Sequence, residues 1–216
     1  TRALNAGDII AIERSVSTSL SVGAQFYRCC HCLQVAMMNL LPCLKSASLM
    51  FCSSACRDLT YKKVGDNLSW MISENNEFNI EKLMCDVEEA YGGREQFLKF
   101  LKASDWCNLN QTFFDFDFSD LSDPSYMQNV IKCILSLDSK PLSASPIPNG
   151  VLEKAGIYAN GNALIEKFAK RLVGIFQRNA SARAYVKRGE DLAERTAEGR
   201  TLFVLKQLFN HACLPN

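Results

Sequence analysis

The residues with the clearest chemistry in this chain are cysteines, and more than half of its ten cysteines fall between Cys29 and Cys56. Cys29 and Cys32 form a Cys-x-x-Cys pair, which places two thiols on one tight turn. Cys52 and Cys56 are spaced i and i+4, which places two more on one face of a helical turn. Four thiolates in a tetrahedral array are the ligands that zinc prefers in a closed structural site. The spacing therefore predicts zinc bound by Cys29, Cys32, Cys52 and Cys56.

Disulfides and scattered buried thiols are the alternatives to a metal site. The first residues contain no uninterrupted apolar core typical of a secretory signal, and no run in the sequence approaches about 18 apolar residues. Without an oxidising compartment, clustered cysteines favour metal binding over disulfides. Cys30 and His31 are expected bystanders, although either can replace a ligand in a distorted finger. Three cysteines stand alone in apolar or helical surroundings and are interpreted as small core residues, Cys85, Cys107 and Cys133.

Composition limits the class of protein without naming a function. With 216 residues, 48% of them hydrophobic and 22% charged, the chain can bury a core and is neither disordered nor membrane-embedded. A net charge of +1 gives no overall electrostatic reason for binding nucleic acid. We therefore expect neither a membrane nor a direct nucleic-acid partner.

The elements that must position the cysteines follow from hydrophobic spacing. Residues 8–12 read as a short buried strand, and residues 57–63 as a short helix that ends before Gly65. Apolar residues recur at helical spacing over 80–91, stop at a pair of glycines, and resume over 97–101. The first half therefore predicts a finger followed by a broken helix or helical hairpin.

The second half mixes loops, helices and strands. Residues 113–118 alternate aromatic and acidic side chains, which suits an edge strand, a loop with tucked rings, or an acidic-aromatic binding segment. Asp123-Pro124 starts a helix with an apolar face through Leu135, and the proline-rich run 139–150 reads as a loop. A further amphipathic helix spans 164–176 and directs Lys167, Lys170 and Arg171 toward solvent. Residues 183–200 most resemble hairpin connections, and 202–205 a strand.

The end of the chain resembles a known family. Asn-His-Ala-Cys-Leu-Pro-Asn at 210–216 resembles the Asn-His-Ser-Cys-x-Pro-Asn motif of SET-domain lysine methyltransferases, and the finger resembles a MYND zinc finger. Gln-Arg-Asn-Ala at 177–180 is similar to the family's Cys-Asn-Ala segment. Residues 199–209 are similar to the family's Gly-x-x-Phe-Pro-x-x-Ser-Leu-Leu segment, which precedes the Asn-His motif, with Val204 in place of the proline. The order of these features is similar to that of the SET and MYND domain family, in the subgroup that carries N-terminal helical repeats.

The resemblance implies an α+β fold, in which a β-rich SET domain is split by an inserted MYND-like finger and a helical insertion. Residues 1–28 would form the N-terminal part of the SET domain and 29–64 a degenerate finger. Residues 65–160 would form a mostly helical insert, and 161–216 the SET core up to the Asn-His motif. We expect the chain to be a fragment of a longer protein at both ends.

The resemblance also implies a cofactor, S-adenosylmethionine. The Asn210 amide would hold its methionine end, the His211 backbone would contact the adenine, Asn179 would add a contact, and Leu208 would flank the pocket. Gln207 and Ala212 replace family serines, and the first change is expected to weaken binding. The family's second zinc site keeps only Cys43 here, so one zinc is expected to remain and one to be lost. No catalytic residue is assigned within the chain, and the fragment alone is expected to be inactive.

Three functions follow. The first is a protein-lysine N-methyltransferase that acts on histone or non-histone proteins in the nucleus and cytoplasm. The second is a non-catalytic interaction module that acts in transcriptional regulation and whose finger binds proline-rich peptides. The third is a zinc-stabilised domain without a cofactor. Cys213 would be a free thiol, because its partners in the family lie in a segment after the SET domain.

Overall fold

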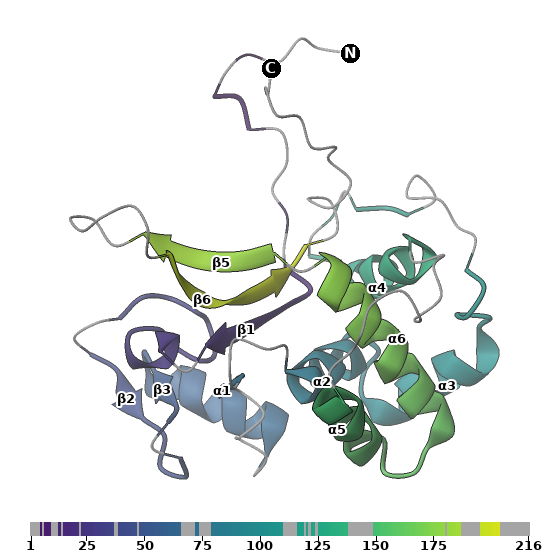
Figure 1. Cartoon of the computed structure of the whole chain (residues 1–216), viewed down its shortest axis with the longest axis horizontal. Helices are drawn as coiled ribbons and strands as arrows, with labels where there is room; N and C mark the ends of the chain where they lie inside the picture. Colours follow the sequence, from purple (N-terminus) through teal and green to yellow (C-terminus); the bar gives the residue numbers. More distant parts are fainter. Residues whose placement is uncertain are drawn as a thin grey trace.

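The computed structural model describes most of the chain up to the last strand. Its described residues are 5, 7–9, 13, 15–21, 23–36, 39–46, 48–65, 72–73, 79–109, 116–118, 120, 122–123, 125–137, 149–179, 181–186 and 195–203. They form a small finger, a four-stranded sheet and a body of helices (Figure 1). None of the helices described is long and apolar enough to cross a membrane.

The sheet is assembled from segments far apart in the sequence. Its strands are β1 (Ser17–Ser21), β4 (Ile72–Ser73), β5 (Ser181–Val186) and β6 (Arg195–Leu202), in the order β4-β1-β6-β5. β1 runs parallel to β4 and antiparallel to β6, with Ser17 opposite Leu202. β5 and β6 form an antiparallel hairpin with a register shift between Arg183 and Ala184. In the described part of the chain, the finger is therefore inserted between β1 and β4, and the helical body between β4 and β5.

The prediction that residues 183–200 are hairpin connections needs correction. Much of this range belongs to β5 and β6, and in β6 charged, small and polar residues predominate over large apolar ones. Backbone pairing with the neighbouring strand, and not a hydrophobic pattern, defines these strands. β6 also ends at Leu202, where the sequence predicted that a strand would begin, and residues 204–205 lie outside those described.

The finger is built from short elements. They are the single 3-10 turn η1 (Ala24–Phe26), the strands β2 (Leu41–Pro42) and β3 (Met50–Phe51), which pair antiparallel, and helix α1 (Ser54–Val64). The Ser53 side chain caps α1 by accepting from the Cys56 N–H at 3.2 Å. The helix stops at Gly65, whose φ is +61°. The predicted helix over 57–63 is confirmed and begins one turn earlier.

The helical body contains α2 (Ile80–Ala90), α3 (Arg94–Ala103), α4 (Tyr126–Leu137), α5 (Asn149–Ala159) and α6 (Ala163–Asn179). The break between α2 and α3 is made by Gly92 and Gly93, which both have positive φ. In the core, Phe168 of α6 makes edge contacts with Phe97 and Trp106 at centroid distances of 5.0 and 5.3 Å. The predicted helices over 80–91, 97–101 and 164–176 are confirmed. The helix predicted to start at Asp123-Pro124 is present but begins at Tyr126, after a bend at Asp123.

Several local predictions need correction. Asp8 and Ile9 are not in a strand, because the Asp8 N–H donates to the Asn5 carbonyl at 3.0 Å and Ile9 is exposed. Residues 10–12 lie outside the described part. The predicted loop over 139–150 gives way to α5 at Asn149, and the sequence reading placed no separate helix there.

Two side-chain predictions also have outcomes. Phe116 and Phe118 pack against the helical core as tucked rings in a loop, while residues 113–115 lie outside the described part. Arg171 does not simply face solvent, because its guanidinium donates to the carbonyls of Trp106 and Leu135 at 2.5 and 2.6 Å. It therefore ties α6 to the segment after α3 and to the end of α4.

Candidate metal centre

Two of the candidate ligands lie on a tight loop after η1. The Cys29 N–H donates to the Gln34 carbonyl, and the Leu33 N–H donates back to the Cys29 carbonyl, both at 2.9 Å. Leu33 adopts a positive φ of 65°, which turns the chain sharply after Cys32. Arg28 and Val35 bridge the base of this loop. The Cys-x-x-Cys spacing therefore becomes a closed turn that directs both sulfurs to one side.

The other two ligands come from the junction of β3 and α1. Cys52 follows Phe51, the last residue of β3, and Cys56 lies in the first turn of α1. The Ser53 cap lies between them and starts the helix at the position that brings Cys56 back toward Cys52. Local sequence thus positions each pair, and the packing of the loop against α1 brings the pairs together.

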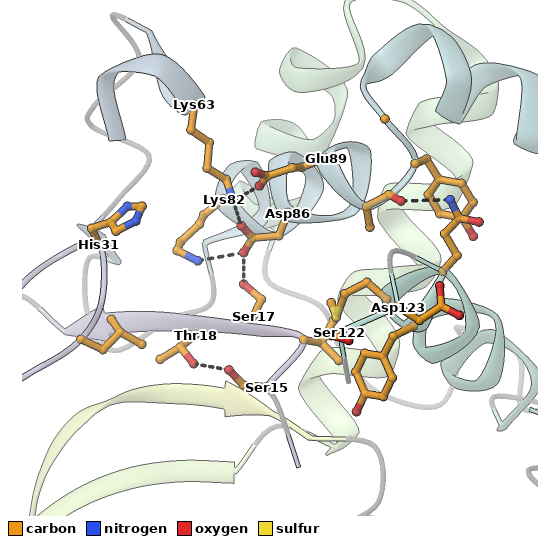
Figure 2. A pocket seen from close by; sticks show the side chains of 18 residues that line it. Ser15, Ser17, Thr18, His31, Lys63, Lys82, Asp86, Glu89, Ser122 and Asp123 are labelled. Atoms are coloured by element: carbon orange, nitrogen blue, oxygen red, sulfur yellow. Dashed lines mark hydrogen bonds and ion pairs between the residues drawn. The ribbon is translucent and has the colours of Figure 1, made fainter. Parts of the chain in front are cut away.

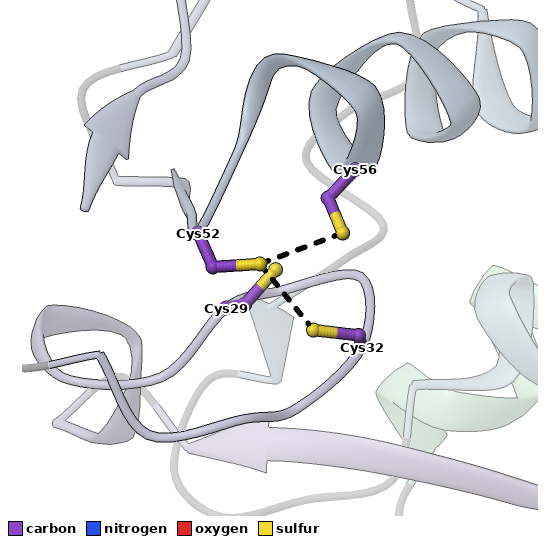
Figure 3. A group of neighbouring side chains, drawn as sticks. All are labelled: Cys29, Cys32, Cys52 and Cys56. Carbon is purple, nitrogen blue, oxygen red and sulfur yellow. Dashed lines mark hydrogen bonds between the residues drawn. The ribbon is translucent and has the colours of Figure 1, made fainter. Parts of the chain in front are cut away.

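The four sulfurs form one compact group (Figure 3). All lie within 4.8 Å of one another, and the Cys32–Cys52 and Cys52–Cys56 sulfurs are each 3.6 Å apart. Tetrahedral zinc with Zn–S bonds of about 2.3 Å places neighbouring sulfurs about 3.8 Å apart. A disulfide would need about 2.05 Å. The four predicted ligands are thus brought together at separations that can hold a metal ion and suit zinc.

The electrostatics of the group also fit a cation. Burial raises the pKa of Cys29, but N–H groups of Cys32, Cys52 and His31 bond its sulfur and bring the pKa below its ordinary value. Burial, together with hydrogen bonds shared with Cys52 and Cys29, raises the pKa of Cys32 to about 12. Four adjacent thiolates repel one another unless a cation lies among them. A metal ion among the four sulfurs would supply that cation.

The predicted bystanders are not ligands. Cys30 is buried beside the loop, its N–H donates to the Met50 carbonyl at 2.8 Å, and burial raises the pKa of its thiol to about 11. The ring of His31 turns to Thr60, 3.0 Å away, instead of to the sulfur group. Burial and the nearby charges of Lys63 and Lys82 lower the pKa of His31. His31 is therefore neutral at physiological pH.

Tyr61 contacts Cys43, the remaining cysteine of the finger. The Tyr61 hydroxyl lies 3.2 Å from the Cys43 sulfur and accepts from the Leu44 N–H at 3.0 Å. The Lys45 N–H also donates to the Cys43 sulfur. Among the described residues, the four-cysteine group is the one set of side chains arranged to hold a metal. The sequence reading did not single out Tyr61, because nothing in its spacing links it to Cys43.

A cleft of about 1210 Å³ lies between the finger and the helical body (Figure 2). At its centre, Asp86 of α2 accepts from Ser17 at 2.8 Å, from Lys82 at 2.8 Å and from Lys63 at 2.7 Å. Burial raises the pKa of Asp86, but Lys82 and Lys63 outweigh this effect and lower it. The sequence reading missed this network, because its members come from β1, α1 and α2.

The side chains of the predicted cofactor residues lie outside what the structure describes. Asn179 is the last residue of α6, and nothing is described of its side chain. Leu208, Asn210 and His211 lie outside the described residues, as does Cys213. The positions of these side chains relative to one another therefore remain a prediction from sequence.

Comparisons with known proteins add no name to the four-cysteine centre. Searches of protein-family models, of curated proteins and of solved structures each found no match.

Proposed function

We propose that the protein is an S-adenosylmethionine-dependent protein-lysine N-methyltransferase. The observation that carries this proposal is the sequence Asn-His-Ala-Cys-Leu-Pro-Asn at 210–216, which begins a few residues after β6. It resembles the cofactor-binding motif of SET-domain methyltransferases. The motif is specific because five of its six specified positions agree, with Ala212 as the departure, and a four-cysteine finger precedes them in the same chain.

The topology of the sheet supports the proposal. A SET domain split by a finger and helices requires strands from both ends of the chain to pair. β1 pairs with β6 across the finger and the helical body, and Gly199 opposes Leu20 in that pairing. In the sequence, the Asn-His motif follows the hairpin β5–β6, which is the order that a split SET domain would have.

The proposed reaction transfers a methyl group to a neutral lysine amine. The amine forms a new C–N bond to the methyl carbon while the C–S bond of the sulfonium breaks and its electron pair stays on sulfur. The resulting methylammonium then loses one proton to solvent. The bound cofactor supplies the activated methyl group. The residues of this chain would bind and orient it, with Asn210 at the methionine end, the His211 backbone at the adenine, and Asn179 and Leu208 beside them. Proximity, orientation and exclusion of water account for most of such a rate enhancement.

The test is a calorimetric titration of the full-length protein with S-adenosylmethionine, followed by a methyl-transfer assay with radiolabelled cofactor and unmodified histones. Asn210→Ala is expected to weaken cofactor binding at least about 10-fold, because it removes a donor and an acceptor that meet charged groups. Asn108→Ala is the control, since Asn108 is an exposed residue that bonds Asp105 within its own turn. Absence of cofactor binding in the zinc-loaded full-length protein would exclude the methyltransferase.

The second candidate function is a non-catalytic interaction module. Seven large apolar side chains are exposed among the described residues, and five of them lie in the finger region, Phe26, Val35, Leu41, Leu44 and Leu59. Leu44 is the most exposed of these, at 78%. Exposed apolar side chains on a small folded unit favour contact with another protein. This observation supports a peptide-binding role for the finger, and we propose that its ligands are proline-rich and that its role is in transcriptional regulation in the nucleus and cytoplasm.

A decaproline peptide titrated into the zinc-loaded protein tests this second function. Leu44→Ser is expected to weaken binding, whereas Ile157→Ser, which removes another exposed apolar side chain, on α5, is not. A protein that binds the cofactor but not the peptide supports the enzyme alone. A protein that binds neither is best described as a zinc-stabilised domain.

A further inference from the structure

Helix α1 presents three polar residues along one face, and each contacts a different part of the molecule. Cys56, Thr60 and Lys63 are spaced i, i+4 and i+7, which aligns them on a helix. Cys56 belongs to the metal centre, Thr60 contacts His31, and Lys63 pairs with Asp86 and Glu89 of α2. One helix therefore connects the metal centre to the cleft beside it.

The Thr60 hydroxyl determines which nitrogen of His31 carries the proton. Thr60 is 1% exposed, and its oxygen lies 3.0 Å from the Cys56 carbonyl and 3.0 Å from His31 Nδ1. A carbonyl can only accept, so the single hydroxyl proton of Thr60 goes to Cys56. The Thr60 oxygen must then accept from His31, which places the imidazole proton on Nδ1. The other nitrogen, Nε2, keeps a free lone pair.

His31 is held at two points. Its backbone N–H bonds the sulfur of Cys29, and its ring bonds Thr60 one turn beyond Cys56. The first contact belongs to the ligand pair on the loop, and the second belongs to the helix that carries the last ligand. His31 therefore bridges the two halves of the four-cysteine group without being a ligand itself.

We propose that Thr60 is a positioning residue of the metal centre, which ties the Cys29–Cys32 loop to α1 through His31 and turns His31 Nε2 toward the cleft as a hydrogen-bond acceptor. Groups beyond the ligands that orient a metal site commonly determine its affinity. Figure 2 shows His31 at the finger side of the cleft, with Lys82 and Asp86 across from it. Lys63 and Lys82 there already donate to Asp86. His31 Nε2 is therefore left to accept from an N–H or O–H donor of a bound molecule, such as a polypeptide amide.

With Thr60 in this role, the shape of the cleft depends on the metal. If zinc leaves, the loop and α1 lose their shared centre, and His31 loses the fixed orientation that gives the cleft its acceptor. The same loss would loosen Lys63, which lies on α1 seven residues after Cys56 and pairs with Asp86. Metal occupancy and the shape of the cleft are thus coupled through one helix. This inference does not depend on whether the protein binds S-adenosylmethionine.

Zinc affinity of the full chain, measured by competition with a chromophoric chelator, is the first test. Thr60→Val keeps the volume but removes the hydroxyl, and it is expected to weaken zinc binding about 10-fold. Thr60→Ser restores the hydroxyl and is expected to bind zinc within about 3-fold of the original protein. Ser104→Ala is the matched control, because Ser104 makes the same hydroxyl contact to the carbonyl four residues earlier, in α3. Unchanged zinc affinity in Thr60→Val overturns the proposal.

The second test is the ¹⁵N NMR spectrum of the imidazoles at about pH 8, where histidine is neutral. The chain has two histidines, and His211→Gln leaves His31 as the only imidazole. Zinc-loaded protein is expected to show the proton on Nδ1, and Thr60→Val is expected to lose this preference. A proton on Nε2 in the zinc-loaded protein overturns the proposal. If Thr60→Val does not fold, His31→Ala removes the same tether, and unchanged zinc affinity in that variant also overturns it.

Discussion

Gly199 of β6 lies directly against the backbone of Ser19 in β1. A Cβ atom at Gly199 would come within 1.9 Å of the Ser19 carbonyl oxygen, and its φ of +150° is one that side chains rarely adopt. Only glycine permits this approach. The contact lies where the strand before the finger meets the strand that leads to the Asn-His segment. This single position therefore determines whether the two parts of the sheet can pair.

Replacing Gly199 is expected to disrupt the sheet. Gly199→Ala should lower the free energy of unfolding by about 4 kcal/mol or prevent folding, because the backbone of Ser19 cannot move aside as a flexible side chain can. Urea unfolding followed by circular dichroism measures the change. Gly23→Ala is the control, since a Cβ there meets no atom within 4 Å and the backbone is already helical. Equal stability of both variants would contradict the close approach.

Metal content is expected to be one zinc per chain. Serine in place of Cys29, Cys32, Cys52 or Cys56 should abolish stoichiometric zinc binding, because each removes one of four thiolates. Cys43→Ser and Tyr61→Phe should leave the zinc content unchanged. The Cys43 sulfur lies 3.2 Å from the Tyr61 hydroxyl and is not one of the four grouped sulfurs. Elemental analysis of protein purified without added zinc measures this. Two zinc ions per chain, or loss of zinc in Cys43→Ser, would contradict a single centre.

Chelation is expected to reduce stability as well as metal content. Zinc bound to four thiolates contributes folding free energy directly, so an excess of chelator should lower the thermal midpoint of the finger. The helical body has its own core around Phe97 and Phe168 and should keep its helical circular dichroism. Thermal scans with and without chelator measure both effects. A thermal transition unaffected by chelator would contradict a structural role for the metal.

Asp86 is expected to stabilise the protein at neutral pH. Its pKa is lowered, so the unfolded state takes up the proton first, and the stabilisation is present above about pH 4 and is lost as the pH falls through the lower folded pKa. Asp86→Asn should cost about 2 kcal/mol at pH 7, because it leaves Lys63 and Lys82 without their shared carboxylate.

Urea unfolding at several pH values measures this effect. The difference between the original protein and Asp86→Asn should shrink below about pH 4. Both proteins are compared without zinc, in excess chelator, so that loss of metal in acid does not enter the difference. Asp58→Asn is the control, because Asp58 is exposed and pairs with Arg57 on the surface of α1. A difference that grows in acid would contradict the lowered pKa.

Arg171 is expected to matter for its shape and not only its charge. Its two terminal nitrogens donate to two carbonyls, those of Trp106 and Leu135, which a single ammonium cannot reproduce. Arg171→Lys should lower the free energy of unfolding by about 1–2 kcal/mol. Lys167→Gln is the control, since Lys167 is exposed and lies over the same indole ring. Equal effects of the two changes, measured by urea unfolding, would contradict the role assigned to Arg171.

The sequence by itself determined the features that depend on near neighbours. The spacings Cys29–Cys32 and Cys52–Cys56 define turns a few residues long, so the ligand set could be read without coordinates. Helices α2 and α6 follow from apolar residues at helical period, with Asn79 and Asn162 as their caps. Both the cysteine turns and the helix starts are formed by hydrogen bonds between residues a few positions apart. The Asn-His segment is likewise a sequence feature, and it lies outside the described residues.

Only the tertiary structure decided which distant side chains meet. Ser17 and Asp86 are 69 positions apart, Arg171 and Trp106 are 65 apart, and His31 and Thr60 are 29 apart. A charged or hydroxyl-bearing side chain has the same local signal whether it faces solvent or a buried partner, so sequence left Arg171 on the surface and Thr60 without a role. Strands β5 and β6 also needed their partner, because ladder hydrogen bonds and not an apolar pattern define them. Partner choice is made through space, and it becomes visible only once the chain has folded.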